Sequence, residues 1–119
     1  MKLIYNPEYA TKNTLATMHH AASVLRGHNC YILSSDNWMR ENMYHRYEAD
    51  AWYAASFMKG ETREWAMETA RNGAIRDVRV GGCDQWCMYG PVYFTKAFSE
   101  QFLPFIESYY RMPGTEQFY

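Results

Sequence analysis

The sequence predicts a single α+β domain with four helices, one of them long and central, and a small, mostly antiparallel sheet. Three observations predict that class. Apolar residues recur at helical spacing in four stretches, β-branched or aromatic runs lie between them, and 119 residues suffice to close one core. Residues 1–119 are therefore expected to form one domain, and residues 113–119 a loose tail.

The chain opens with a short strand followed by a helix. Residues 2–5 (KLIY) are apolar and are stopped by an Asn-Pro pair. A helix is expected over residues 14–26, because Asn13 or Thr14 can accept hydrogen bonds from its first amides. Gly27 suits the left-handed conformation that often ends a helix.

The next elements are a strand over residues 29–34 and a long helix over residues 36–59. Ser35 can cap this helix and Gly60 can end it, and at 1.5 Å per residue it would be about 36 Å long. Two of its faces carry large apolar or aromatic residues. The first face has Met39, Met43, Tyr47, Ala54 and Met58, and the second has Trp38, His45 and Trp52. A helix with two such faces is either central or presents one face to a partner.

A third helix is predicted over residues 62–72, with Asn72-Gly73 at its end. A fourth helix begins after Thr95 or Ser99. Pro104 lies inside its apolar pattern and must either kink this helix or mark its first turn.

Residues 81–90 (GGCDQWCMYG) lie between two predicted strands, residues 74–80 and 90–95. The pattern predicts a β-hairpin at about residues 74–95, with a long tip bounded by glycines. That tip would carry Trp86, Met88 and Tyr89.

Composition and charge exclude several classes of protein. The net charge is −1 and charges are evenly mixed, so direct nucleic-acid binding and mimicry of DNA are both disfavoured. No apolar run could span a bilayer, and there is no signal-peptide pattern. No phosphate-binding loop motif occurs, so no cofactor is expected. An odd number of cysteines indicates a reduced, cytoplasmic protein.

Metal sites are an alternative that the motifs support only weakly. Cys83 and Cys87 are spaced four apart, unlike the pairs of common zinc knuckles. The set that could complete a zinc site is His28, Cys30, Cys83 and Cys87. Glu41, His45 and Glu48 would share one face of the long helix, where local pairing on a solvated face is the better interpretation than a metal site. No metal is therefore expected.

The composition favours a protein that binds another protein. Aromatic residues make up 18% of the chain and methionine occurs eight times, and these types are enriched in interfaces. The predicted partner-binding residues are Trp86, Met88, Tyr89, Trp38, Trp52, Arg76 and Arg79. The last two belong to an arginine cluster, with Arg71, that could instead hold a phosphate.

The resulting hypothesis is a small non-enzymatic protein that inhibits a larger complex by occupying its surface. Anti-CRISPR and anti-restriction proteins of phages or mobile elements are examples of this type, and the comparison is one of type without a shared motif. The alternatives are a small zinc-dependent or phosphoryl-handling enzyme and a sponge that binds a nucleotide ligand. The hypothesis expects a protein partner and no membrane, and it leaves a homodimer open.

Overall fold

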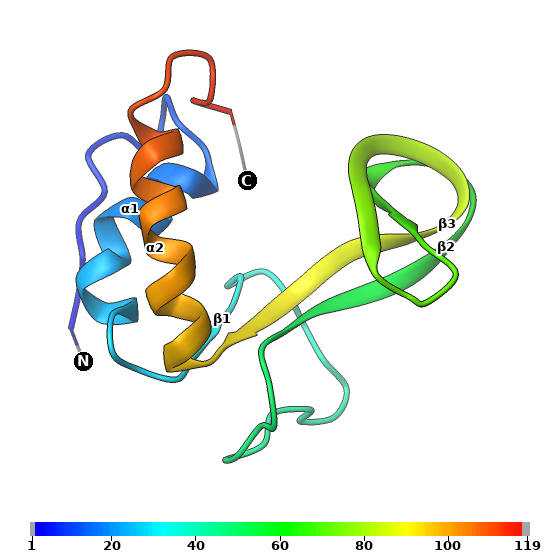
Figure 1. Ribbon diagram of the computed structural model, residues 1–119, viewed down its shortest axis with the longest axis horizontal. Helices are drawn as coiled ribbons and strands as arrows, with labels where there is room; N and C mark the ends of the chain where they lie inside the picture. Colours follow the sequence, from blue (N-terminus) through cyan, green and yellow to red (C-terminus); the bar gives the residue numbers. More distant parts are fainter. Residues whose placement is uncertain (1, 118–119) are drawn as a thin grey trace. The chain divides into compact units, whose positions relative to one another are not determined.

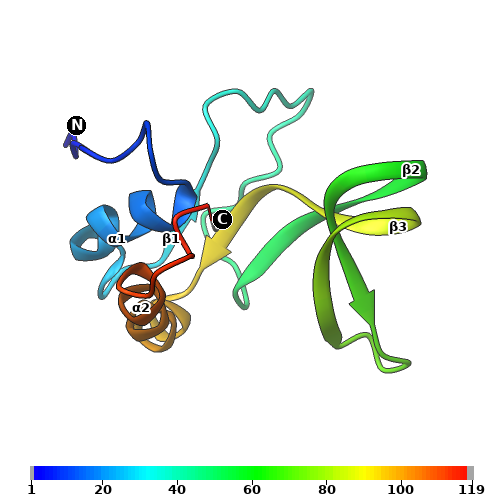
Figure 2. The same cartoon turned by 90° about the horizontal axis from the view of Figure 1, so that it is seen from above.

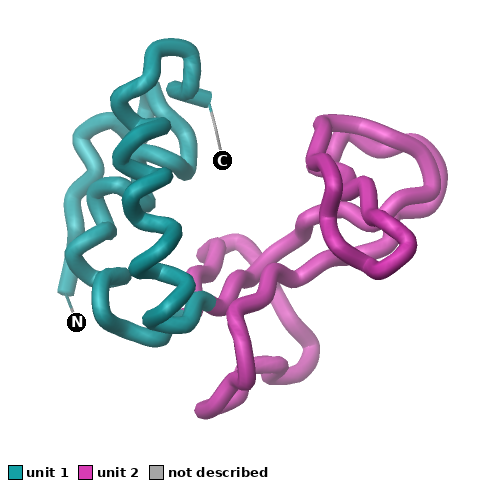
Figure 3. The backbone as a smooth tube through the Cα atoms, viewed as in Figure 1, with its two compact units in different colours: residues 1–30, 94–119 teal, residues 31–93 magenta. Residues whose placement is uncertain are grey.

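The computed structural model describes residues 2–117, and the chain divides into two compact units (Figure 3). One unit comprises residues 1–30 and 94–119, and the other comprises residues 31–93. The elements follow one another as α1 (Thr14–Leu25), β1 (Cys30–Ile32), β2 (Trp52–Thr69), β3 (Ile75–Phe94) and α2 (Lys96–Tyr110), as Figure 1 shows. No helix among the described residues is long and apolar enough to cross a membrane.

Helix α1 confirms the predicted helix and both of its end signals. The Asn13 side chain accepts a hydrogen bond from the backbone amide of Thr14 at 2.9 Å. The chain leaves the helix at Arg26, and Gly27 follows with a φ of +78°, a conformation that favours glycine. Ala16 and Leu25 are buried.

Helix α2 packs against α1 and confirms the predicted last helix. The Thr95 hydroxyl accepts from the amide of Phe98 at 3.1 Å, which caps the first turn. Leu103 and Ile106 are each 2% exposed and form the centre of this unit's core. Pro104 lies inside the helix on its exposed side and removes one backbone donor there.

The sheet has the strand order β1-β3-β2, and β2 pairs with β3 in antiparallel fashion. These two strands form one long hairpin. Its turn is closed by a hydrogen bond from the amide of Ala70 to the carbonyl of Ala74 at 2.8 Å, and Gly73 adopts a φ of +83° within it.

The hairpin curls back on itself (Figures 1 and 2). Ala66 is paired with both Arg79 and Cys87, which lie far apart along β3. The curl buries Ala66 and Cys87 completely. The strand register shifts between Met58 and Glu61. Gly60 lies in this interval with a φ of +76°, which interrupts the regular strand conformation.

The prediction of four helices, one long and central, was wrong. Residues 33–51 are irregular, and the remainder of the predicted helix at residues 36–59 belongs to β2. Of the predicted helix at residues 62–72, residues 62–69 belong to β2 and residues 70–72 to the turn that follows it. Methionine and tryptophan at helical spacing misled the interpretation, because tertiary pairing overrides weak local periodicity. Over residues 2–117 the chain is a small α+β fold with two helices.

The hairpin predicted at residues 74–95 was also wrong, because the observed turn lies before β3, between Ala70 and Ala74. Residues 81–90 are not a tip but the middle of β3, a strand of 20 residues that runs to Phe94. Gly81 adopts a φ of +85° and Asp84 a φ of +52° inside this strand. Gly81, and Gly90 with a φ of +104°, therefore mark irregular strand positions and not the ends of a loop.

The N-terminal strand was also not observed. Residues 2–5 are outside any regular element, and Leu3 and Tyr5 are more than three-quarters exposed. At the other end, the Thr115 hydroxyl donates to the carbonyl of Tyr109 at 2.5 Å, and the amide of Asn13 donates to the carbonyl of Glu116 at 2.8 Å. Residues 118 and 119 of the predicted tail lie outside the described residues. The single-domain organisation stays a prediction.

Candidate functional site

Four aromatic side chains gather in the unit formed by residues 31–93. The Tyr31 ring lies at their centre, with ring centroids 4.9 Å from Tyr44, 5.9 Å from Trp52 and 4.8 Å from Tyr93. Trp52 and Tyr93 stack with an interplanar angle of 26°. Tyr93 is buried, whereas the other three rings are partly exposed. We call these four residues the aromatic cluster.

A carboxylate borders the aromatic cluster. The Tyr31 hydroxyl donates to Glu48 Oε1 at 2.5 Å, and His45 Nδ1 lies 3.2 Å from the same oxygen. The hydrogen bond from Tyr31 is the main cause that lowers the pKa of Glu48, and bonds from His45 and Trp52 lower it further. Burial, followed by the bond to Glu48, raises the pKa of Tyr31. Glu48 is therefore charged at neutral pH and is held by hydrogen bonds from side chains that include Tyr31 and Trp52 of the aromatic cluster.

The irregular segment of residues 33–51 brings Glu48 to Tyr31. Short polar side chains shape it: Asn42 accepts from the amide of Tyr44 at 3.0 Å, and Asp50 accepts from the amide of Ala51 at 2.7 Å. Such bonds offer the backbone an alternative to a helix. The amide of His45 also donates to the Tyr31 hydroxyl at 3.0 Å, which fixes the segment against β1.

This arrangement suits a small organic cation. Aromatic faces attract ammonium groups through the negative charge on the ring face, and clusters of such rings recognise quaternary ammonium ligands. Glu48 adds a formal negative charge next to the Tyr31 hydroxyl, with a side chain that is 16% exposed. The aromatic cluster together with Glu48 is the best candidate for a binding site among the described residues.

A second polar cluster holds the other unit together. Glu8 forms an ion pair with Lys12 at 2.6 Å and accepts from the Tyr110 hydroxyl at 2.6 Å. Glu8 also lies 3.0 Å from His20, and His19 stacks on the Tyr110 ring at 3.7 Å. The bond from Lys12, followed by that from Tyr110, lowers the pKa of Glu8 to about 2. Glu8 thus fastens the N-terminal segment to both helices.

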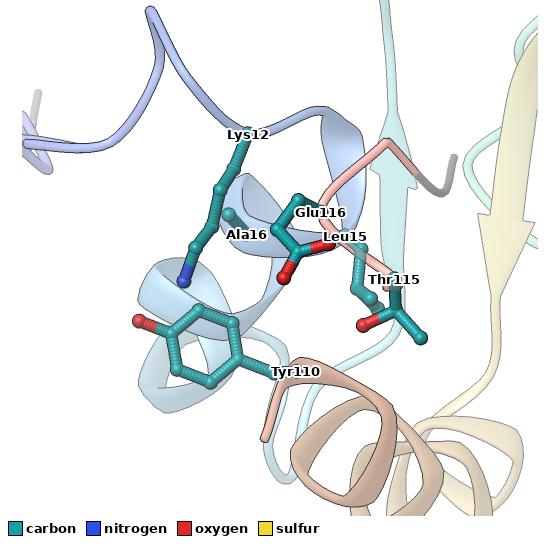
Figure 4. Close-up of a pocket in the computed structure, with 6 residues that line it drawn as sticks. All are labelled: Lys12, Leu15, Ala16, Tyr110, Thr115 and Glu116. Atoms are coloured by element: carbon teal, nitrogen blue, oxygen red, sulfur yellow. The ribbon is translucent and has the colours of Figure 1, made fainter. Parts of the chain in front are cut away.

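Figure 4 shows a small pocket beside this polar cluster. The Lys12 ammonium lies over the Tyr110 ring, 4.2 Å from its centroid. The lining residues are Lys12, Leu15, Ala16, Tyr110, Thr115 and Glu116. The pocket is too small for an organic ligand, so this cluster is structural.

The residues predicted for the hairpin tip lie along β3. Trp86 forms an edge-to-face pair with Phe57 on β2, with centroids 5.7 Å apart, and both rings are about half exposed. Tyr89 is exposed and Met88 is partly exposed. They therefore lie on a strand surface, and contact of these three residues with a protein partner stays a prediction.

The remaining predicted partner residues are scattered. Trp38 is 82% exposed in the irregular segment, whereas Trp52 belongs to the aromatic cluster. Arg76 lines an open pocket with Phe57 and Trp86. Arg79 forms ion pairs with the carboxylates of Glu68 and Asp77. A partner, a homodimer and nucleic-acid binding all stay untested.

The zinc set is not assembled. Among residues 2–117 no group of three or more His, Cys, Asp or Glu side chains is arranged to hold a metal ion. Cys83 is exposed and Cys87 is buried, and all three cysteines are free thiols. His45 and Glu48 do pair with each other, but in an irregular segment and not on a helix, and Glu41 is exposed.

The comparisons with known proteins point to enzymes. A 2-aminoethylphosphonate cytidylyltransferase of Lancefieldella rimae is 25% identical over 118 residues, which is 98% of this chain and 48% of that protein. A choline-phosphate cytidylyltransferase of Streptococcus pneumoniae is 21% identical over 110 residues, covering 92% of this chain and 47% of that protein. No protein-family profile matches the chain.

A solved structure matches the whole chain. The CTP:phosphocholine cytidylyltransferase from Streptococcus pneumoniae superposes with a TM-score of 0.84 at 19% identity, over 100% of this chain and 51% of that one. The chain has a cytidylyltransferase-like fold. It spans about half the length of the curated relatives that it matches.

These findings overturn the hypothesis of a non-enzymatic inhibitor of the anti-CRISPR or anti-restriction type. The matched proteins are cytidylyltransferases by name, and the match extends over nearly the whole chain. The sequence reasoning failed because abundant tryptophan, tyrosine and methionine indicate exposed recognition surfaces in general. Tryptophan and tyrosine also line sites for small cations.

Three members of the candidate site escaped the sequence reasoning. Tyr31 and Tyr93 fell in predicted strands and Tyr44 in the predicted long helix, so nothing linked them. Trp52 was singled out, but as part of a protein-binding patch. The two predicted strands that contain Tyr31 and Tyr93 are both rich in aromatic residues. This signal could have indicated the site only if the pairing of the strands had been known.

Proposed function

We propose that this chain is the acceptor-binding part of a cytidylyltransferase-type enzyme, and that the aromatic cluster holds the acceptor's positively charged nitrogen. The observation that carries the proposal is that the partly exposed rings of Tyr44 and Trp52 lie around Tyr31, whose hydroxyl holds the charged Glu48. The fold likeness and the two relatives support it independently.

The names of the relatives supply the acceptor's chemistry. Choline phosphate and 2-aminoethylphosphonate both carry a charged nitrogen joined by a short carbon chain to a phosphate or phosphonate group. A site for either compound needs a surface that favours a small cation over a neutral group. Ring faces and a carboxylate meet that need, because both attract positive charge without a covalent bond.

The residues would act by positioning. Trp52 and Tyr31 hold the cationic end, and Glu48 is itself fixed by its bond from the Tyr31 hydroxyl. The anionic end of the acceptor is then free to attack the α-phosphorus of CTP. That attack forms the new P–O–P bond and releases pyrophosphate. Holding one end of a small acceptor in this way removes much of the entropic cost of the reaction.

We further propose that the protein works in the cytoplasm. Its three cysteines are free thiols, including the exposed Cys83, as expected in a reducing compartment.

The test is a titration with choline and with its uncharged isostere 3,3-dimethylbutan-1-ol, followed by isothermal calorimetry or by the tryptophan fluorescence. The two compounds match in shape, so any difference in Kd measures charge recognition. We expect choline to bind about tenfold more tightly or better. Phosphocholine and 2-aminoethylphosphonate are then compared to define the preferred acceptor.

Two variants locate the site. Glu48→Gln should weaken choline binding and leave the weak binding of the neutral isostere unchanged, because it removes only the charge. Trp38→Ala is the matched control, since Trp38 is an exposed tryptophan outside the aromatic cluster. Equal affinity for choline and the isostere in the unmodified chain would refute the proposal, as would an equal loss in both variants.

A further inference from the structure

The curl of the β2–β3 hairpin creates an open pocket of about 320 Å³. Residues near the turn and residues near the base of the hairpin line it together, because the curl brings Ala66 to both Arg79 and Cys87. The volume lies at the lower end of the range for small-molecule sites, which is about 300–1,000 Å³. We call it the hairpin pocket, and its lining residues include Phe57, Met67, Glu68, Arg76, Asp84 and Trp86.

Two half-exposed rings form the apolar part of the hairpin pocket. Phe57 is 47% exposed and Trp86 is 53% exposed, and their ring centroids lie 5.7 Å apart in an edge-to-face arrangement. Met67 adds a thioether side chain, which adapts to irregular apolar shapes. A flat apolar group that packs on these rings removes them from water, so this part of the pocket favours a ligand with an aromatic ring.

Two charges of opposite sign line the same pocket without pairing. Neither the Arg76 guanidinium nor the Asp84 carboxylate forms an ion pair with a side chain of residues 2–117. Glu68, the other carboxylate of the pocket, is already bound to Arg79 at 2.6 Å. A ligand that carries both an ammonium and a carboxylate group can compensate Arg76 and Asp84 together, which a ligand with a single charge cannot do.

The Asp84 carboxylate is held by an unusual backbone conformation. Asp84 has a φ of +52°, and in the part of the chain that the structure describes it is the only residue other than glycine with a positive φ. Its Oδ1 accepts from the amide of Gly60 at 2.9 Å, and its Oδ2 makes a weak contact with the Cys83 thiol at 3.7 Å. Backbone strain of this kind is concentrated at functional sites. An oriented carboxylate with one weakly bonded oxygen is suited to receive an ammonium group.

We propose that the hairpin pocket binds a free amino acid with an aromatic side chain. The ring of the ligand packs on Phe57 and Trp86, its ammonium group binds Asp84, and its carboxylate binds the planar guanidinium of Arg76. The pocket shares no lining residue with the aromatic cluster, so it is a second ligand site. The inference does not rest on the proposed function.

The test is a titration of the ¹⁵N-labelled 119-residue chain with L-phenylalanine, followed by NMR. Shifts of the Trp86 indole N–H and of the Arg76 side chain report binding in the hairpin pocket, and we expect a Kd on the order of 1 mM. L-Phenylalaninamide lacks the carboxylate and N-acetyl-L-phenylalanine lacks the ammonium group. Each of these analogues should bind about fivefold more weakly than phenylalanine.

Two variants assign the charges. Arg76→Gln should abolish the preference for phenylalanine over phenylalaninamide, and Asp84→Asn should abolish the preference over N-acetylphenylalanine. Asparagine tolerates a positive φ and keeps an acceptor for the amide of Gly60, so Asp84→Asn should remain folded. Arg71→Gln is the matched control, because Arg71 is an exposed arginine of the same hairpin outside the pocket, and it should change the Kd by about twofold or less.

Three results would overturn the proposal. They are the absence of shifts at Trp86 and Arg76 up to the solubility limit of phenylalanine, equal affinity for phenylalanine and its two analogues, and an equal loss in Arg76→Gln and Arg71→Gln. None of these readouts involves choline or the aromatic cluster. A failed choline titration would thus leave this inference standing, and its own failure would not affect the acceptor site.

Discussion

Replacing Trp52 by alanine should weaken the binding of choline by about 5- to 30-fold. The indole is the largest ring of the aromatic cluster and the aromatic type that binds cations best. It is partly exposed and stacks on Tyr93 at 6.4 Å. A cation over a partly desolvated ring gains about 1–2 kcal/mol, which corresponds to that range in Kd.

The same substitution also costs stability. Trp52 makes ring contacts with Tyr31 and Tyr93, and each such pair contributes about 0.5–1.5 kcal/mol beyond its buried area. We therefore expect the free energy of unfolding to fall by about 1–3 kcal/mol. The circular dichroism spectrum and the unfolding midpoint must show that the variant is folded at the temperature of the titration.

Trp52→Phe separates the two effects. Phenylalanine keeps a ring face and much of the packing but has a weaker attraction for cations, so a loss of about two- to fivefold is expected. Calorimetric titration of choline into Trp52→Ala, Trp52→Phe and Trp38→Ala measures all three. The reasoning would be refuted if folded Trp52→Ala bound choline as tightly as the unmodified chain does.

Three further predictions concern stability. The pKa of Glu8 is about 2 in the folded chain, against an ordinary value of 4.5. The charged Glu8 carboxylate therefore stabilises the fold fully above pH 4.5, and this stabilisation is lost as the pH falls toward 2. Thermal melts between these pH values should show a smaller pH dependence of the unfolding midpoint in Glu8→Gln than in the unmodified chain. Ile106→Ala should lower the free energy of unfolding in urea by about 2–5 kcal/mol, whereas exposed Phe105→Ala should change it by about 0.5 kcal/mol or less. Asp84→Ala should cost about 1–3 kcal/mol in the same assay, because Asp84 has a φ of +52° and accepts from the amide of Gly60, and Asp84→Asn should recover most of the loss.

The helix ends were predictable because their signals are local. Asn13 and Thr95 cap helices through side chains that reach the first amides, and Gly27 ends α1 in a left-handed conformation. None of these signals requires knowledge of distant residues. The strand at residues 29–34 was also confirmed as β1, although it is shorter than predicted.

The long hairpin was not predictable by the same reasoning. Along β2, Tyr53, Ala55 and Phe57 are exposed and their neighbours are less so, which is the alternation of a strand. Apolar residues occur at both the exposed and the less exposed positions of β2, however, so a hydrophobicity pattern does not reveal the alternation. The curl that pairs Ala66 with both Arg79 and Cys87 depends on register, which no local pattern encodes.

The candidate site was out of reach for a related reason. Tyr31 and Glu48 are 17 positions apart and meet only because an irregular segment folds back on β1. The prediction of a helix over residues 36–59 placed Glu48 on a helical face and so directed it away from Tyr31. An error in one element thus removed a charged residue from the site and left Trp52 without its ring partners.

The strand predicted at the N-terminus was wrong for a different reason. Residues 3–5 were predicted as a strand from an apolar run, and the described chain holds no strand there. A strand is stable only with a partner, so local preference alone cannot form one. The apolar run of Leu-Ile-Tyr therefore indicates only a local preference, and within residues 2–117 it has no neighbouring strand to pair with.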